Sequence, residues 1–328
     1  MVELVSILII LFLCWVTLAT ADASVAGLCA LLGRARFKTV FLWGLLSLLI
    51  PVVAVAYGTL IEKNWYQVKE VTVGSAKLPE SFDGFRIVQV SDIHLRSFAK
   101  RPESLRKAVE KINSLNADIV CFTGDLITMD VSEINDMYDI LKDIKGPVFS
   151  VLGNHDYHIY AGGDGNVDEP ARQAKVEALI SCERELGWEL LLNYNRYLYR
   201  AGGGIYIMGV ENTSASEYFP SHGDLEAAMC GTDGRFCILL SHDPTHWDME
   251  VVGKDIPLTL SGHTHATQFS LLGWCPGRYL FKQYRGLYTK GRQNLYVNAG
   301  LGETIFPARI GARPEITLIT LKKSYNIN

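Results

Sequence analysis

Five short polar clusters along the chain contain the residue types that bind divalent metal ions. In order they are Asp92-Ile93-His94, Gly124-Asp125, Asn154-His155-Asp156, His242 and Gly262-His263-Thr264-His265. Carboxylate and imidazole ligands together suit Mn²⁺, Fe²⁺ or Zn²⁺ better than Ca²⁺ or Mg²⁺ alone. Each cluster by itself has an ordinary alternative, because an aspartate after a strand is often a turn residue or a helix cap. The prediction of a metal site therefore depends on whether the fold brings the clusters together.

Each cluster follows a short apolar run of the kind that forms a buried strand. The runs are 84–90, 119–122, 148–152, 236–240 and 258–261. Apolar residues at helical spacing predict helices over 101–115 and 131–144, between the first three runs. This βαβαβ pattern implies a largely parallel sheet, whose loops at the carboxyl ends of the strands are the usual ligand site. If the backbone after the first run stays extended, Asp92 and His94 point the same way.

Other segments complete an α/β fold. The sequence predicts an opening strand over 65–72, a Gly- and Asp-rich loop over 161–169 and a helix over 171–187. Further strands are expected at 204–210, 294–298 and 315–321, the last two as extra strand pairs.

The ordered clusters resemble the motifs DxH, GD, GNHD/E, H and GHxH of the calcineurin-like metallophosphoesterase superfamily, and the likeness runs from about residue 85 to 321. Within that superfamily the chain resembles the membrane-anchored bacterial branch. The resemblance implies a four-layer α/β/β/α sandwich and a dinuclear metal-dependent phosphohydrolase. In such an enzyme a metal-bound water attacks a phosphate ester, here a diester or a pyrophosphate, with a lipid-linked substrate as one hypothesis.

Two divalent ions about 3.5–4 Å apart need a ligand that both can share, and a carboxylate is the natural bridge. Asp125 fits that role. The resemblance implies two sets of ligands around it: Asp92, His94 and His265 for the first ion, and Asn154, His242 and His263 for the second.

The resemblance also implies catalytic and substrate-binding residues. His155 is expected to face the phosphate as a general acid, with Asp156 orienting its imidazole. Arg309 and Arg313 are candidates for holding a substrate phosphate. The alternative for either arginine is a salt bridge, for example with Glu315.

The first 65 residues predict a membrane anchor, leaving 66–328 as the catalytic domain. The apolar run 40–60 is long enough to span a bilayer, which takes about 20 residues, and the run 4–20 is marginal. Arg34, Arg36 and Lys38 between them form a basic loop, which the positive-inside rule assigns to the cytoplasm. The catalytic domain is then expected on the outer side of a bacterial inner membrane. A helical pair buried in the protein core is the alternative.

Composition narrows the partners to a phosphorylated small molecule or lipid and the membrane. The net charge of −4 gives no reason to expect nucleic acid. Seven cysteines without a CxxC pair argue against a disulfide scaffold and a zinc ribbon. The aromatic segment 269–288 has three possible roles: an acyl-chain groove, a bilayer surface or core packing.

Alternative functions are an enzyme like the UDP-diacylglucosamine pyrophosphatases of lipid A synthesis and a non-catalytic, metal-dependent scaffold. Two helices of this kind supply no polar pathway, which argues against a transporter.

Overall fold

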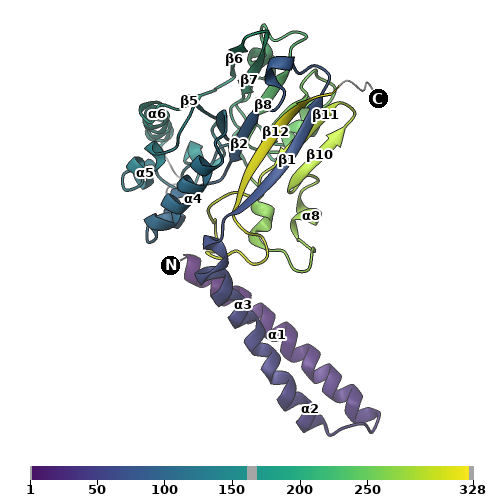
Figure 1. The fold of residues 1–328 in the computed structure, drawn as a ribbon. Helices are drawn as coiled ribbons and strands as arrows, with labels where there is room; N and C mark the ends of the chain where they lie inside the picture. Colours follow the sequence, from purple (N-terminus) through teal and green to yellow (C-terminus); the bar gives the residue numbers. More distant parts are fainter. Residues whose placement is uncertain (1, 161–167, 325–328) are drawn as a thin grey trace.

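The computed structural model describes residues 2–160 and 168–324, and consists of a helical hairpin and an α/β body (Figure 1). The hairpin, residues 2–64, contains α1 (Val2–Leu31), α2 (Phe37–Gly44), η1 (Leu45–Leu48), α3 (Leu49–Leu60) and η2 (Glu62–Asn64). Two stretches, Leu4–Leu31 and Phe37–Asn64, are each 28 residues long and apolar enough to cross a membrane. Such a length exceeds the roughly 20 residues that a bilayer core requires.

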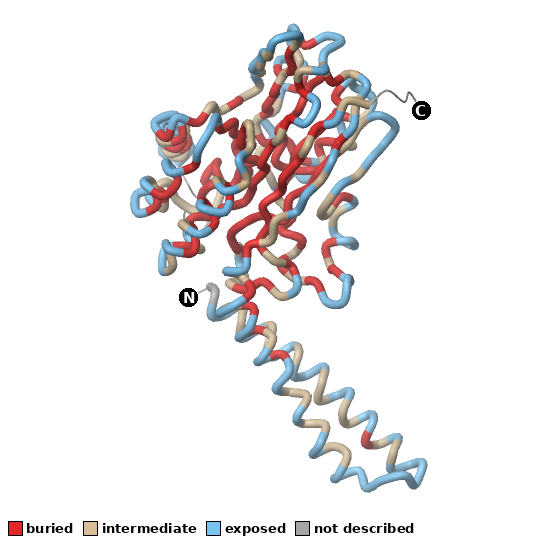
Figure 2. The backbone as a smooth tube through the Cα atoms, viewed as in Figure 1, coloured by how far each residue is buried: buried red, intermediate tan, exposed pale blue. Residues whose placement is uncertain are grey.

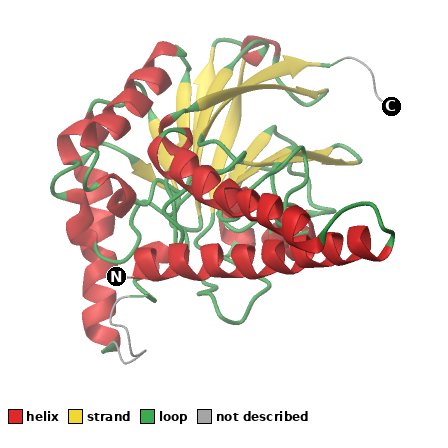
Figure 3. Cartoon of the chain, turned by 90° about the horizontal axis from the view of Figure 1, so that it is seen from below, coloured by secondary structure: helices red, strands yellow, loops and turns green. Residues whose placement is uncertain are grey.

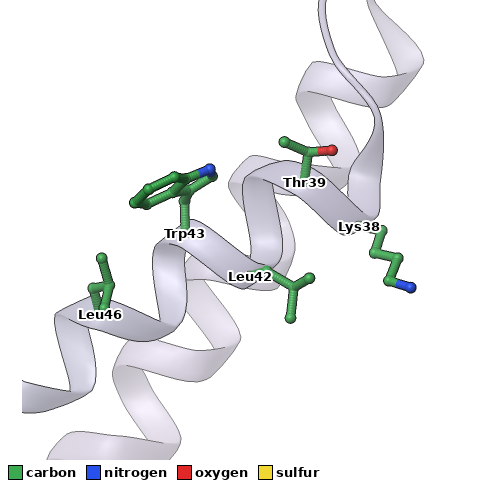
Figure 4. Close-up of a pocket in the computed structure, with 5 residues that line it drawn as sticks. All are labelled: Lys38, Thr39, Leu42, Trp43 and Leu46. Atoms are coloured by element: carbon green, nitrogen blue, oxygen red, sulfur yellow. The ribbon is translucent and has the colours of Figure 1, made fainter.

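Polar contacts join the two sides of the hairpin. The indole N–H of Trp15 donates to the carbonyl of Leu48 at 2.9 Å, and the Ser47 hydroxyl donates to the Asp22 carboxylate at 2.8 Å. A hollow on the surface of α2, lined by Lys38, Thr39, Leu42, Trp43 and Leu46, lies at the end of the hairpin farthest from the body (Figures 1 and 4). Its place on an apolar helix surface, remote from the polar clusters, gives it no role in their chemistry.

The first sheet of the body has the strand order β1-β12-β2-β3-β4-β5. Its strands are β1 (Gln67–Ser75), β2 (Arg86–Val90), β3 (Ile119–Phe122), β4 (Val148–Ser150), β5 (Glu189–Leu190) and β12 (Glu315–Lys323). Strands β2 to β5 are parallel, which confirms the βαβαβ pattern. Strand β12 runs parallel to β1 and antiparallel to β2.

The second sheet has the order β10-β11-β9-β8-β7-β6. It contains β6 (Tyr194–Arg200), β7 (Gly203–Gly209), β8 (Cys237–Leu240), β9 (Leu258–Ser261), β10 (Gly286–Lys290) and β11 (Gln293–Val297). The two C-terminal strands expected at 294–298 and 315–321 are present as β11 and β12. They belong to different sheets, and β12 inserts between β1 and β2 instead of forming an added pair.

Helices cover the outer faces of the two sheets (Figure 3). Helices α4 (Pro102–Ser114), α5 (Tyr138–Lys142) and α6 (Glu169–Glu185) pack against the first sheet, and α7 (Leu225–Met229) packs against the second. Between the sheets lies a buried core that includes Ile87, Phe149, Ile238 and Leu260 (Figure 2). The arrangement confirms the four-layer sandwich. A short helix, α8 (Gly277–Leu280), lies outside these layers.

The helix expected over 131–144 is shorter than predicted. The chain forms a 3₁₀ turn at Val131–Ile134, and α5 begins only at Tyr138. The Glu133 carboxylate accepts hydrogen bonds from the backbone N–H groups of Thr128, Met129 and Asp130, which hold the preceding loop in a tight curve. Of the loop expected over 161–169, residues 161–167 lie outside the described part, and Glu169 opens α6.

Candidate metal centre

The polar clusters follow β2, β3, β4, β8 and β9, and their side chains meet at the carboxyl ends of these strands. The backbone there is left-handed, with φ of 51° at Asp92, 46° at His94 and 60° at Asp125. The condition of an extended backbone through Asp92 and His94 is therefore not met. Non-glycine residues rarely adopt such angles, and strained backbone of this kind concentrates at functional sites. Tight turns, not extended chain, bring these side chains together.

Two glycines permit the close approach of neighbouring turns. A Cβ atom on Gly124, whose φ is 89°, would lie 2.6 Å from the backbone nitrogen of Gly153. A Cβ atom on Gly153 would collide with the Asp125 carboxylate. The loops after β3 and β4 can thus touch only because both positions lack a side chain.

Asp125 lies between two groups of ligand atoms. Its Oδ2 is 3.5 Å from Nε2 of His94 on one side and 3.2 Å from Nε2 of His242 on the other. The carboxylate is buried. One oxygen therefore faces both groups, which is the arrangement that a shared ligand requires.

The first group contains Asp92, His94 and His265, whose ligand atoms lie within 4.8 Å of one another. The Nε2 atoms of His94 and His265 are 3.1 Å apart, and Nε2 of His265 is 3.2 Å from Oδ1 of Asp92. Two imidazole nitrogens and a carboxylate oxygen that converge in this way suit a transition-metal ion.

The second group contains Asn154, His242 and His263. Oδ1 of Asn154 is 3.2 Å from Nε2 of His242 and 2.8 Å from Nδ1 of His263. The Thr123 carbonyl lies 2.7 Å from Nδ1 of His242, so it accepts the proton of that nitrogen and leaves Nε2 for a metal. With Asp125, each group offers four ligands, and the donor set fits two divalent ions.

Burial and mutual attraction set the charges of these groups. Burial lowers the pKa of His94 and of His265 well below the usual value, so both imidazoles are neutral and able to bind a metal. Burial works against ionisation of Asp125, but attraction to His242 and His155 holds the pKa of its carboxyl well below the usual range. Burial also opposes a charge on His242, yet Asp125 raises the pKa of that imidazole to about 10. The carboxylate of Asp125 thus favours a positive charge at Nε2 of His242, where a metal cation would take the place of the proton.

His155 is held by a partner different from the one expected. Its Nδ1 lies 2.7 Å from the carbonyl of Thr128, which fixes the proton on Nδ1 and leaves Nε2 on the side of His94 and Asp125. The carboxylate of Asp156 instead accepts the backbone N–H groups of Asp125 and Gly153 at 2.8 Å, Leu126 at 3.0 Å and Ile127 at 3.2 Å. The prediction that Asp156 orients the imidazole is therefore wrong. Asp156 shapes the turn that carries Asp125.

The two candidate phosphate-binding arginines are also engaged elsewhere. Arg309 is fully buried, and its guanidinium donates to the carbonyls of Ala299, Gly302 and Ala312. Arg313 stacks on the Trp65 ring at 3.7 Å, and its Nε lies 3.6 Å from the Glu62 carboxylate. Neither arginine pairs with Glu315. Arg309 thus holds loops together beside His265, whose Nδ1 lies 3.4 Å from its Nη2, and Arg313 lies at the end of the hairpin. Their assignment to a substrate phosphate stays a prediction.

Several aromatic residues beside the centre carried no motif in the sequence. The Tyr160 ring lies 4.2 Å from that of His155, and its hydroxyl accepts a hydrogen bond from Asn154 at 3.1 Å. Phe219 and Phe281 lie 5.0 and 6.0 Å from the His263 ring. Asp243 was also missed, although its Oδ2 lies 3.7 Å from Nε2 of His263. Its position directly after His242 was the one feature of the sequence that could have indicated it.

The segment 269–288 is partly core and partly exposed. Cys275 is fully buried, whereas Leu272 is 100% exposed and Tyr279 is 71% exposed. Core packing thus accounts for part of this segment and leaves its large apolar tip unexplained.

Comparison with known proteins agrees with this geometry. The family model for calcineurin-like phosphoesterases matches residues 85–267. A zebrafish transmembrane protein with a metallophosphoesterase domain is 33% identical over 295 residues, which cover 85% of this chain and 62% of that protein. The uncharacterised metallophosphoesterase YkuE of Bacillus subtilis is 32% identical over 278 residues, covering 82% of this chain and 90% of YkuE.

A third relative carries a named activity. The UDP-2,3-diacylglucosamine pyrophosphatase LpxG of Chlamydia trachomatis is 27% identical over 304 residues, which cover 77% of this chain and 88% of LpxG. The match of the family model across all five polar clusters, together with the YkuE similarity, shows that this chain is a metallophosphoesterase of the calcineurin-like family.

Proposed function

We propose that the protein is a membrane-anchored phosphohydrolase that holds two divalent ions, with residues 1–65 as the anchor and 66–328 as the catalytic domain. The position of the Asp125 carboxylate between two ligand groups carries this proposal. Asp92, His94 and His265 would hold one ion, and Asn154, His242 and His263 the other. Such ions, Mn²⁺, Fe²⁺ or Zn²⁺, supply Lewis acidity and a nucleophile at neutral pH.

The side chains of the protein supply positioning and proton transfer. Because the Thr128 carbonyl accepts the Nδ1 proton of His155, Nε2 is the nitrogen that would take up a second proton and, as part of the imidazolium, give it to the leaving oxygen of a phosphate ester. The aromatic rings of Tyr160 and Phe219 border the centre beside His155 and His263. Asp156 keeps the Asp125 turn in place through its four backbone hydrogen bonds.

A soluble diester tests the proposal. With Mn²⁺ and bis(p-nitrophenyl) phosphate, Asp125→Asn and His155→Ala should each lower kcat at least about a hundredfold, the range of a lost acid–base group. Asp139→Asn, on the exposed face of α5, is a matched control and should turn over like the wild type. Unchanged turnover in both site variants, with the folded state retained, would defeat the assignment.

For the substrate we propose a lipid-linked phosphate diester or pyrophosphate. The similarity to LpxG and the apolar helices beside the catalytic body support this choice. UDP-2,3-diacylglucosamine is the direct probe, and the expected result is faster cleavage than that of soluble diesters. Equal rates on UDP-2,3-diacylglucosamine and on bis(p-nitrophenyl) phosphate would contradict a lipid preference.

We further propose that the catalytic domain faces the side of the membrane opposite the basic loop of Arg34, Arg36 and Lys38. Alkaline phosphatase fused after Lys63 should be active, because that reporter works only outside the cytoplasm. An inactive reporter would reverse the orientation and would place the active site beside cytoplasmic nucleotide-linked lipids.

A further inference from the structure

Six of the large apolar side chains that the catalytic body exposes lie in two loops, at 271–280 and at 305. They are Leu271, Leu272, Trp274, Tyr279, Leu280 and Ile305, here called the apolar tip. Their exposure runs from 45% at Trp274 to 100% at Leu272. Single exposed apolar residues are ordinary, but a group of this size marks a surface that contacts another apolar phase.

The backbone of the apolar tip offers a second sign that folding does not explain these residues. Leu272 has a φ of 48° and Ile305 a φ of 53°. Left-handed backbone favours glycine or asparagine, and a β-branched residue such as isoleucine is a clear outlier there. Neither packing nor backbone preference within the described fold accounts for a leucine at 272 or an isoleucine at 305.

Ile305 of the tip and the segment that follows it contact the two candidate membrane segments. The Ser6 hydroxyl of α1 donates to the carbonyl of Ile305 at 3.0 Å. The N–H of Arg309 points to the carbonyl of Gly58 in α3 at 3.4 Å, and a Cβ atom on Gly58 would meet the Arg309 carbonyl at 2.7 Å. The backbone N–H of Ser270 in turn donates to the Ile310 carbonyl at 2.7 Å, which connects this segment to the loop of the tip. A bilayer around the hairpin would thus begin where the tip is attached.

The register of the first sheet places the metal centre at the same end of the body. Gln67, the first residue of β1 after the hairpin, pairs with Glu315 of β12. Two residues further along β12, Thr317 pairs with Gln89 of the antiparallel strand β2, whose carboxyl end leads to Asp92. The end of β2 that carries the ligands therefore points toward the hairpin, as does the loop containing α8 (Figure 1). Phe281, directly after the tip, reaches within 6.0 Å of the His263 ring.

From these observations we infer that the apolar tip inserts into the bilayer that holds the helical hairpin, with the acyl-chain boundary as its ligand, and sets the metal centre at the lipid–water interface. The inference rests on the membrane anchor of the proposed function. Trp274 and Tyr279 suit this depth, because their rings favour the boundary between headgroups and chains. Arg278, exposed between them in the sequence, suits anionic headgroups.

Fluorescence quenching in bilayers measures this insertion. The full chain is reconstituted in phosphatidylcholine–phosphatidylglycerol vesicles, with and without bromine on the acyl chains. The emission of Trp274 is obtained by subtracting the emission spectrum of Trp274→Phe from that of the wild type. This subtraction removes the signal of the other tryptophans, including those of the hairpin. Insertion by about 5–10 Å should quench roughly half or more of it. The same difference for Trp188→Phe, a buried residue under α6, should be insensitive to bromine.

Two variants test the tip itself. Leu272→Asp introduces a charge at a fully exposed position, so the fold is kept, and it should reduce the quenching of Trp274 at least about twofold because a charge resists the acyl region. Tyr199→Asp, at an exposed aromatic position on β6 at the end of the body away from the hairpin (Figure 1), should leave the quenching unchanged.

Unquenched Trp274 emission in the wild type would overturn the inference. A detergent-solubilised dimer that Leu272→Asp converts to a monomer would also overturn it, since a second copy would then cover the tip. The proposed function has a separate test. It fails if the wild-type protein does not hydrolyse bis(p-nitrophenyl) phosphate, even when its Trp274 emission is quenched.

Discussion

Replacing Asp156 by asparagine tests whether this residue builds the metal centre through the backbone. Its carboxylate accepts four N–H groups at 2.8–3.2 Å, two of them from Asp125 and Gly153. Asparagine keeps one oxygen and turns an NH₂ group toward donors, so about half of these bonds are lost. At about 1.5–3 kcal/mol for each hydrogen bond to a charged group, the free energy of unfolding should fall by roughly 3–6 kcal/mol.

The loss should extend to metal binding, because the freed N–H groups belong to the turn that presents Asp125. We expect about a 10–100-fold weaker Mn²⁺ affinity, the usual effect of losing a supporting contact. Urea unfolding and isothermal titration with Mn²⁺ measure the two effects, with Asp139→Asn as the surface control. A cost below about 1 kcal/mol, or an effect confined to the pH profile of His155, would refute this role and restore Asp156 as the partner of the imidazole.

Three further predictions concern other buried groups. Burial raises the pKa of Glu183 from 4.5 to about 8, so as pH rises its carboxyl ionises in the unfolded chain before it does so in the folded protein. The free energy of unfolding should therefore fall between about pH 4.5 and pH 8. Glu183→Gln should flatten that slope, by at most about 1.4 kcal/mol per pH unit in urea titrations, and an unchanged slope would contradict it. Arg309→Lys should lower the melting temperature because one ammonium cannot reach three carbonyls, whereas an unchanged melting temperature with a raised KM would support the phosphate-binding role. Removing metal ions with a chelator should lower the melting temperature of the wild type and have a smaller effect on Asp125→Asn; equal shifts would indicate binding elsewhere.

Much of the fold was predictable because local patterns agreed with the global arrangement. The apolar runs before Asp92, Asp125 and Asn154 are buried parallel strands, as their period and flanking residues indicated. The helix expected over 131–144 is instead divided, because the turn at Val131–Ile134 ends before α5 begins at Tyr138 although the apolar spacing continues.

The sequence by itself determined which residue types stand at the ends of the strands, and in what order, because ligand chemistry and strand patterning are properties of short stretches. It could not determine which groups Asp156 and Arg309 contact, or that Leu272 is fully exposed. Their partners lie in turns and loops that only the assembled sheets bring together, such as the carbonyls around Arg309 or the hairpin beside Ile305. The convergence of the ligands is likewise a tertiary result. Left-handed turns at Asp92 and Asp125, tolerated because the surrounding structure holds them, carry the ligand side chains.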